Sequence, residues 1–138
     1  KDDITSYFKK IGEREGIDFY PEVISEKLIE LTAPMIMKLK NHYDRPRPKV
    51  LASKMGIKLN DIEMSSMKTP SYPSGHSVQG VLIGNVLATM FPLSANEFLK
   101  AGKDISYSRN IARAHYKSDS KFGEAIGLEL HKYLKQNQ

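Results

Sequence analysis

The chain has 138 residues, of which 40% are hydrophobic and 27% charged, and its formal net charge is +5 at pH 7. These proportions are ordinary for globular proteins and predict one domain, residues 1–138, with a single hydrophobic core. The absence of cysteine excludes disulfide bonds and thiolate metal sites. The net charge favours anionic partners, either by steering a substrate or simply as a soluble basic surface.

The chain begins with a short predicted helix. Asp2 and Asp3 can cap this helix, which is expected to end at about Arg14. Four apolar residues recur in it at helical spacing: Ile4, Tyr7, Phe8 and Ile11. The pattern indicates one buried face.

A second, longer helix follows a break at residues 16–21. Pro21 suits its first turn, and the helix is expected to reach about Tyr43. Its apolar residues keep the 3.6-residue period: Val23, Ile24, Leu28, Leu31, Met35, Ile36 and Leu39. Pro34 interrupts the run and is predicted to kink the helix or to split it in two.

Residues 44–75 form a long connection with prolines near both ends and a short polar helix expected near residues 60–67. Long ordered connections of this kind are usually functional. We therefore expect this segment to contribute to a functional site and not to the hydrophobic core.

The segment 77–91 is apolar on almost every side, which places it at the centre of a helical bundle. Its apolar residues are Val78, Val81, Leu82, Ile83, Val86, Leu87, Met90 and Phe91. No stretch alternates with a period of two for long enough to indicate a sheet. The predicted fold is therefore all-α, a compact bundle around the helix at about residues 77–91.

Two more helices complete the expected bundle. Ser94 and Glu97 fit a capping box that opens the first of them. This helix is expected to bury Phe98, Ala101, Ile105 and Ala112, with Arg109 on the same stripe. The second is expected at about residues 121–135, with Phe122, Ile126, Leu130 and Leu134 buried.

The longest apolar run, residues 80–93, contains Asn85 and ends near Pro92, so it is too short to span a bilayer. The chain is accordingly expected to be soluble, with no transmembrane segment. Two compartments stay open: the periplasm, after removal of a leader peptide, and the cytoplasm.

The clearest chemical pattern is S-R-N-I-A-R-A-H-Y-K-S-D at residues 108–119, which contains Arg109-x5-His115-x3-Asp119. If the backbone is helical there, Asp119 can reach one ring nitrogen of His115. That contact would fix the tautomer and leave the other nitrogen free to attack an electrophile. Arg109 adds a permanently charged fork suited to phosphate oxygens.

Two other blocks precede this pattern, K-N-H-Y-D-R-P-R-P at residues 40–48 and Y-P-S-G-H-S at residues 72–77. The ordered set K-x6-R-P, P-S-G-H and S-R-x5-H-x3-D resembles the superfamily of type 2 phosphatidic acid phosphatases, class A nonspecific acid phosphatases and vanadium haloperoxidases. The three blocks span more than half of the chain. The H-Y of the first block and the H-Y-x-S-D of the third are most similar to the soluble bacterial class A enzymes.

This resemblance implies an acid-phosphatase-like phosphoric monoester hydrolase that works without a metal or other cofactor, through a phosphohistidine. It makes His115 the nucleophile, Asp119 the group that orients it, and His76 the acid that protonates the leaving oxygen. The phosphate-binding residues it implies are Lys40, Arg47, Ser74, Gly75 and Arg109. The helix-opening pair in P-S-G-H, Ser74 and Gly75, would add a hydroxyl and backbone N–H groups.

A second assignment of the phosphate-binding pair stays open. Lys38 and Arg45 satisfy the same spacing as Lys40 and Arg47, although only the second pair places His42 and Tyr43 where the class A pattern has its H-Y. Three further residues have a structural interpretation: Asp119 as the N-cap of the last helix, with or without its catalytic role, His76 as a surface residue at a helix N-terminus, and His42 as a packing residue instead of one that lines the pocket. His131 is expected to face solvent, Tyr72, Tyr107 and Tyr116 to pack in the core or at the rim, and Arg113 either to reach substrate or to lie outside.

Two rival functions also fit the blocks. The first is a vanadate-dependent haloperoxidase, which would bind vanadate as its cofactor, whereas vanadate would inhibit a phosphatase. The second is a non-catalytic module that would only bind anions. The expected partner is a small phosphoester, with a possible homo-oligomer. Nucleic acid is not expected, because the basic residues are spread along the chain without aromatic clusters.

Overall fold

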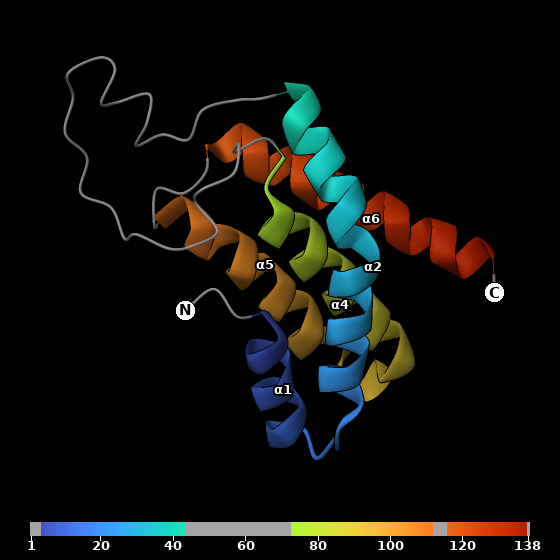
Figure 1. Ribbon diagram of the computed structural model, residues 1–138. Coiled ribbons are helices and arrows are strands. Elements are labelled where there is room, and N and C mark those ends of the chain that lie inside the picture. The colour runs from blue at the N-terminus through green and yellow to red at the C-terminus, as the bar shows by residue number, and fades with distance from the viewer. Residues whose placement is uncertain (1–3, 44–72, 112–115, 138) are drawn as a thin grey trace.

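The computed structural model describes residues 4–43, 73–111 and 116–137 (Figure 1). Within these ranges the regular structure is helical, with no strand. The elements are α1 (Ile4–Arg14), α2 (Tyr20–Tyr43), α4 (Gly75–Met90), the 3₁₀ turn η2 (Pro92–Ser94), α5 (Ala95–Ile111) and α6 (Lys117–Gln136). The predicted all-α fold is confirmed.

Helix α4 is the centre of the bundle. It contacts α5 and α6 most extensively, and α2 and α1 less so, as its position between them in Figure 1 illustrates. Nine of its residues are buried: Ser77, Val78, Gly80, Val81, Leu82, Ile83, Gly84, Leu87 and Ala88. The helix expected at residues 77–91 is therefore present and begins two residues earlier, at Gly75. It has the central position that its apolar character predicts.

The hydrophobic core lies between α1, α4 and α5. Its buried members are Ile4, Phe8, Ile11, Ile83, Leu87, Ala88, Phe98, Ala101 and Ile105. Phe8 and Phe98 are completely buried, whereas Tyr7, which was expected on the buried face of α1, is partly exposed. The sequence pattern thus locates most of this face of the core correctly.

Glycines set how closely α5 and α6 approach α4. A Cβ added to Gly102 of α5 would lie 2.6 Å from the Gly80 carbonyl oxygen of α4. A Cβ added to Gly123 of α6 would lie 2.6 Å from the Ser74 carbonyl oxygen, and one on Gly127 would lie 2.7 Å from that of Val78. Because these distances are too short for real Cβ contacts, larger residues would separate the helices.

Helix α6 differs from its prediction in two ways. It begins at Lys117, four residues before the expected start, and its buried residues are Asp119, Ser120, Gly123 and Gly127. The four apolar residues expected to be buried are each only half-buried: Phe122, Ile126, Leu130 and Leu134. The face that contacts α4 is made of small residues because the two backbones come so close together.

Of the kink or split predicted at Pro34, the split is wrong, because α2 is continuous across this residue. Its buried residues are Pro21, Ser25, Thr32, Ile36 and Lys40, whereas Val23 and Leu31 are exposed. The predicted caps Asp2 and Asp3, and the helix expected near residues 60–67, lie outside the described residues.

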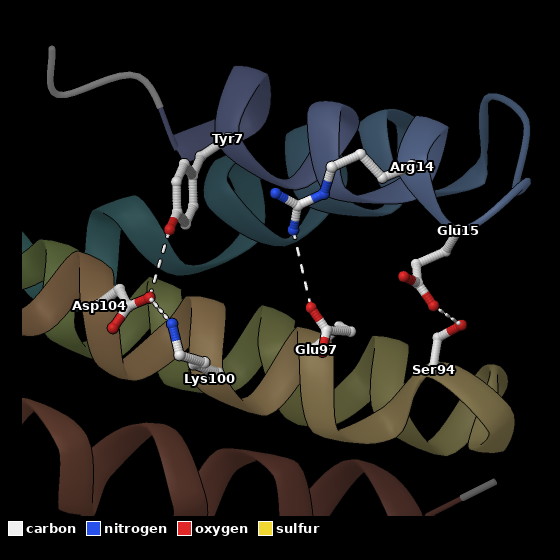
Figure 2. A network of polar contacts seen from close by, with 7 residues as sticks. All are labelled: Tyr7, Arg14, Glu15, Ser94, Glu97, Lys100 and Asp104. Carbon is white, nitrogen blue, oxygen red and sulfur yellow. Dashed lines mark hydrogen bonds and ion pairs between the residues drawn. The ribbon is translucent and has the colours of Figure 1, made fainter.

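Polar contacts join α1 to the beginning of α5 (Figure 2). The Ser94 hydroxyl donates to Glu15 Oε1 at 2.8 Å, and Arg14 pairs with Glu97 at 3.7 Å. The two side chains expected to form a capping box therefore contact the C-terminal end of α1. A third contact runs from the Tyr7 hydroxyl to Asp104 Oδ2 at 3.4 Å.

Burial, and secondly the Asp104 carboxylate, raise the pKa of the Tyr7 hydroxyl above its ordinary value of 10.0. Lys100 also reaches Asp104, at 3.2 Å. These exposed ion pairs contribute little stability individually, so the apolar core is the main attachment of α1.

None of the helices in the described ranges is long and apolar enough to cross a membrane.

The close approach of α6 to α4 predicts that Gly127→Ala is destabilising. In a helix interior, alanine is normally more stabilising than glycine by roughly 0.8–1 kcal/mol. At position 127, however, the alanine Cβ would collide with backbone atoms of α4. We expect a net loss of about 1–3 kcal/mol in the free energy of unfolding, measured by urea denaturation. Leu128→Ala, at an exposed position of the same helix, should change it by less than about 0.5 kcal/mol. A more stable Gly127→Ala variant would contradict the packing described above.

Candidate active site

The P-S-G-H block forms the N-terminal end of α4. Ser74 is its N-cap, with φ −72° and ψ 112°, and the Ser74 Oγ accepts the Ser77 N–H at 3.2 Å. The first backbone hydrogen bond of the helix runs from the Val78 N–H to the Ser74 carbonyl oxygen. The N–H groups of Gly75 and His76 come earlier in this first turn. This end of α4 carries a positive partial charge, which favours an anion.

The third block opens α6. The Asp119 side chain is completely buried, and its Oδ2 accepts the Tyr116 N–H at 2.8 Å, as part of a capping box. The N-cap position considered for Asp119 is taken by Tyr116 instead, and Asp119, at the third position of the helix, accepts the backbone N–H of that N-cap. The carboxylate is thereby held beside Tyr116, the residue that follows His115 in the chain.

The helical interpretation of His115-x3-Asp119 is wrong at Tyr116. This residue has φ −80° and ψ 160°, an extended conformation, and α6 begins only at Lys117. Any contact between Asp119 and His115 therefore does not follow from the regular spacing of a helix.

A direct hydrogen bond connects the second and third blocks. The Ser74 N–H donates to the Asp119 carbonyl oxygen at 3.1 Å. Gly123, which lies close against the Ser74 carbonyl, is four residues further along α6. The P-S-G-H turn and the start of α6 are therefore fixed side by side.

The first block reaches the same end of the bundle through Lys40, in the last turn of α2 (Figure 1). Lys40 is 5% exposed, and its Cε would lie 3.7 Å from a Cβ built on Gly75. Lys38, its rival in the K-x6-R-P spacing, is exposed. A buried ammonium needs polar partners, and a bound anion can be one of them.

The remaining predicted residues cannot be placed in the same way. Arg47 and His115 lie outside the described residues, as do Arg45 and the additional Arg113. Arg109 belongs to the last turn of α5, but its side chain is not among those that the structure describes. The site geometry of the described residues therefore concerns Lys40, Ser74, Gly75, His76 and Asp119.

Several residues singled out by the sequence have ordinary surroundings. His42 is exposed and lies edge-on to Tyr43, with ring centroids 4.9 Å apart, and Tyr43 in turn contacts Phe122 at 5.9 Å. His131 is half-buried, not fully solvent-facing, and its Nε2 is 3.2 Å from Thr89 Oγ1. Burial, and secondly Lys135, lower the pKa of His131. Tyr107 is exposed, contrary to the packing expected of it.

One group near the site was missed by the sequence analysis. Ser77, Ser106 and Glu124 form consecutive hydrogen bonds between α4, α5 and α6. The only signal in the sequence was the presence of serine, a polar residue, on helices expected to be buried. Within the described part of the chain, no three histidine, aspartate or glutamate residues form a group that could hold a metal ion.

Comparison with known proteins agrees with the predicted family. The model of the PAP2 superfamily matches residues 28–136, and the chain belongs to this superfamily. Curated relatives include the non-specific acid phosphatases of Salmonella typhimurium and Salmonella typhi, 38% and 36% identical over 88 residues. An acid phosphatase of Zymomonas mobilis is 34% identical over 88 residues. The matched segment covers 64% of this chain but only 33–35% of these relatives, so the chain spans about a third of their length.

Proposed function

We propose that this chain contains the phosphoryl-transfer centre of an acid-phosphatase-like enzyme, which hydrolyses small phosphate monoesters through a phosphohistidine and without a metal. The observation that supports this best is the 3.1 Å hydrogen bond from the Ser74 N–H to the Asp119 carbonyl. It joins the block that carries the proposed acid to the block that carries the proposed nucleophile. The acid phosphatases among the relatives point to the same class of reaction.

The proposed first step is attack by a ring nitrogen of His115 on phosphorus. An N–P bond forms while the ester P–O bond breaks, and protonated His76 gives its proton to the departing oxygen. In the second step neutral His76 takes a proton from water. The water oxygen then attacks phosphorus, the N–P bond breaks, and inorganic phosphate leaves.

Asp119 orients His115 and stabilises its positive charge after attack. Its carboxylate is itself fixed, because Oδ2 accepts the Tyr116 N–H at 2.8 Å. One carboxylate can accept several hydrogen bonds, so the capping role and the orienting role are compatible. The buried position of Asp119 strengthens its effect on a neighbouring imidazolium.

Lys40, Arg47 and Arg109 neutralise the three equatorial oxygens in the transition state, with help from the N-terminal end of α4. The positive charge that a metal would otherwise supply comes from these side chains. The burial of Lys40 against Gly75 favours Lys40 with Arg47 over the pair Lys38 and Arg45. The Ser74 hydroxyl, which accepts from the Ser77 N–H, retains its own proton for a phosphate oxygen.

The reaction class is tested by hydrolysis of p-nitrophenyl phosphate in the presence of a chelator. The rate should stay within about twofold of the rate without chelator, because no metal supplies the Lewis acid. Vanadate should inhibit, since its trigonal-bipyramidal form resembles the transition state. Loss of activity with chelator, restored by a divalent metal, would contradict the metal-free mechanism. Sustained bromination in the presence of vanadate, peroxide and bromide would support the haloperoxidase function instead.

The role of His76 is tested by its dependence on the leaving group. His76→Ala should lower kcat/KM, which reports the first step and not the later attack of water, by about 10²–10⁴-fold on alkyl phosphates, because their leaving oxygen requires a proton. The loss on p-nitrophenyl phosphate should be about tenfold or less, since nitrophenolate leaves without one. The control is His131→Ala, on α6 beside Thr89, which should leave both rates unchanged. Equal losses on the two substrates would show that His76 is not the acid.

A further inference from the structure

Three buried or half-buried polar side chains join α4, α5 and α6 near the candidate site. The Ser77 Oγ is 2.6 Å from the Ser106 Oγ, and the Ser106 Oγ donates to Glu124 Oε2, also at 2.6 Å. Ser77 and Ser106 are completely buried, and Glu124 is half-buried. The mechanism proposed above uses none of these three side chains.

The direction of these hydrogen bonds follows from their chemistry. The Ser106 hydroxyl donates a hydrogen bond to Glu124 Oε2, and the carboxylate oxygen accepts it. The Ser106 oxygen is then left to accept the proton of the Ser77 hydroxyl. Bonds of this length to a charged acceptor are among the stronger ones in proteins, and breaking one would leave a buried hydroxyl without its partner.

Each residue of this network lies close to a residue of the candidate site. Ser77 follows His76 directly, and its N–H donates to the Ser74 hydroxyl. Ser106 lies three residues, or about one helical turn, before Arg109. Glu124 follows Asp119 by five residues on α6, where Gly123 brings the helix against Ser74 and Ser77.

The apolar contacts of α4 with its neighbours are not directional and tolerate small shifts of one helix along another. Hydrogen bonds of 2.6 Å between three helices do not tolerate such shifts. Phosphoryl transfer depends on groups held within about 0.5 Å of their productive positions. The network provides this constraint at the ends of the helices that carry the acid, a phosphate-binding arginine and the orienting aspartate.

We infer that Ser106 and Glu124 are positioning residues for phosphoryl transfer, acting through Ser77 on the P-S-G-H turn. This inference rests on the function proposed above. Neither side chain needs to touch the substrate. Their loss should therefore reduce kcat more than it raises KM, because the groups still bind phosphate but no longer align with one another in the transition state.

The experiment compares Ser106→Ala with Ser94→Ala. Both variants remove a serine hydroxyl that donates to a glutamate, but Ser94 bonds to Glu15 beyond the opposite end of α4 (Figure 2). The length of this 16-residue helix separates the two ends by roughly 24 Å. Steady-state kinetics with p-nitrophenyl phosphate are measured at a temperature where circular dichroism shows each protein folded.

Ser106→Ala should lose about tenfold or more in kcat while KM changes less than about threefold, since a misplacement of about 1 Å can cost roughly 10²-fold. Ser94→Ala should keep the wild-type values. A folded Ser106→Ala variant with the kcat of Ser94→Ala would overturn the inference.

A second pair covers the case in which Ser106→Ala does not fold. Glu124 is only half-buried, so its truncation leaves the core intact. Glu124→Gln keeps an acceptor oxygen and should retain kcat within about threefold, whereas Glu124→Ala should lose about tenfold or more. Equal kcat values for the two would overturn the inference while leaving the proposed function in place. A folded wild-type protein that hydrolyses no phosphate monoester would overturn the proposed function and this inference together.

Discussion

The arrangement of this bundle depends on how closely α5 and α6 approach α4. Glycines at the contacts make this approach possible, since a Cβ on Gly102, Gly123 or Gly127 would lie 2.6–2.7 Å from a carbonyl oxygen of α4 or of its N-cap. Several polar contacts follow from the same approach. The Ser74 N–H reaches the Asp119 carbonyl, and the Ser77 and Ser106 hydroxyls come within 2.6 Å of each other. The geometry of the candidate site therefore depends on the same close helix packing that the small residues allow.

The candidate site uses the ends of helices, where backbone groups lack partners within the helix. The N-terminal end of α4 offers N–H groups and a positive partial charge, and Lys40 adds a buried cation from the last turn of α2. Asp119 lies in the same region, in the first turn of α6. Separate segments of the chain thus contribute different charges to one end of the bundle, while the hydrophobic core with Phe8 and Phe98 extends between α1, α4 and α5.

Much of the fold could be predicted from the sequence, because helical periodicity and the apolar character of residues 77–91 depend on local pattern alone. The buried face of α6 could not be predicted in this way, since glycine and serine carry no hydrophobic signal and only the neighbouring backbone explains them. The three blocks identified the superfamily, yet spacing misjudged the backbone at Tyr116, which is extended. The contacts of Ser106 with Ser77 and Glu124 depend on three helices at once, and no local pattern describes them.

The central claim is that His115 carries the phosphoryl group between the two steps, and trapping of the phosphoenzyme tests it most directly. The protein is mixed with a phosphate monoester and quenched within milliseconds in alkaline denaturant, because the N–P bond of phosphohistidine survives base and is labile in acid. Peptide mapping by mass spectrometry then locates the phosphate. We expect it on His115 in the wild-type protein and on no residue in His115→Ala, whose turnover should also be abolished. A phosphoenzyme that persists in His115→Ala, or none in an actively hydrolysing wild-type protein, would contradict the account.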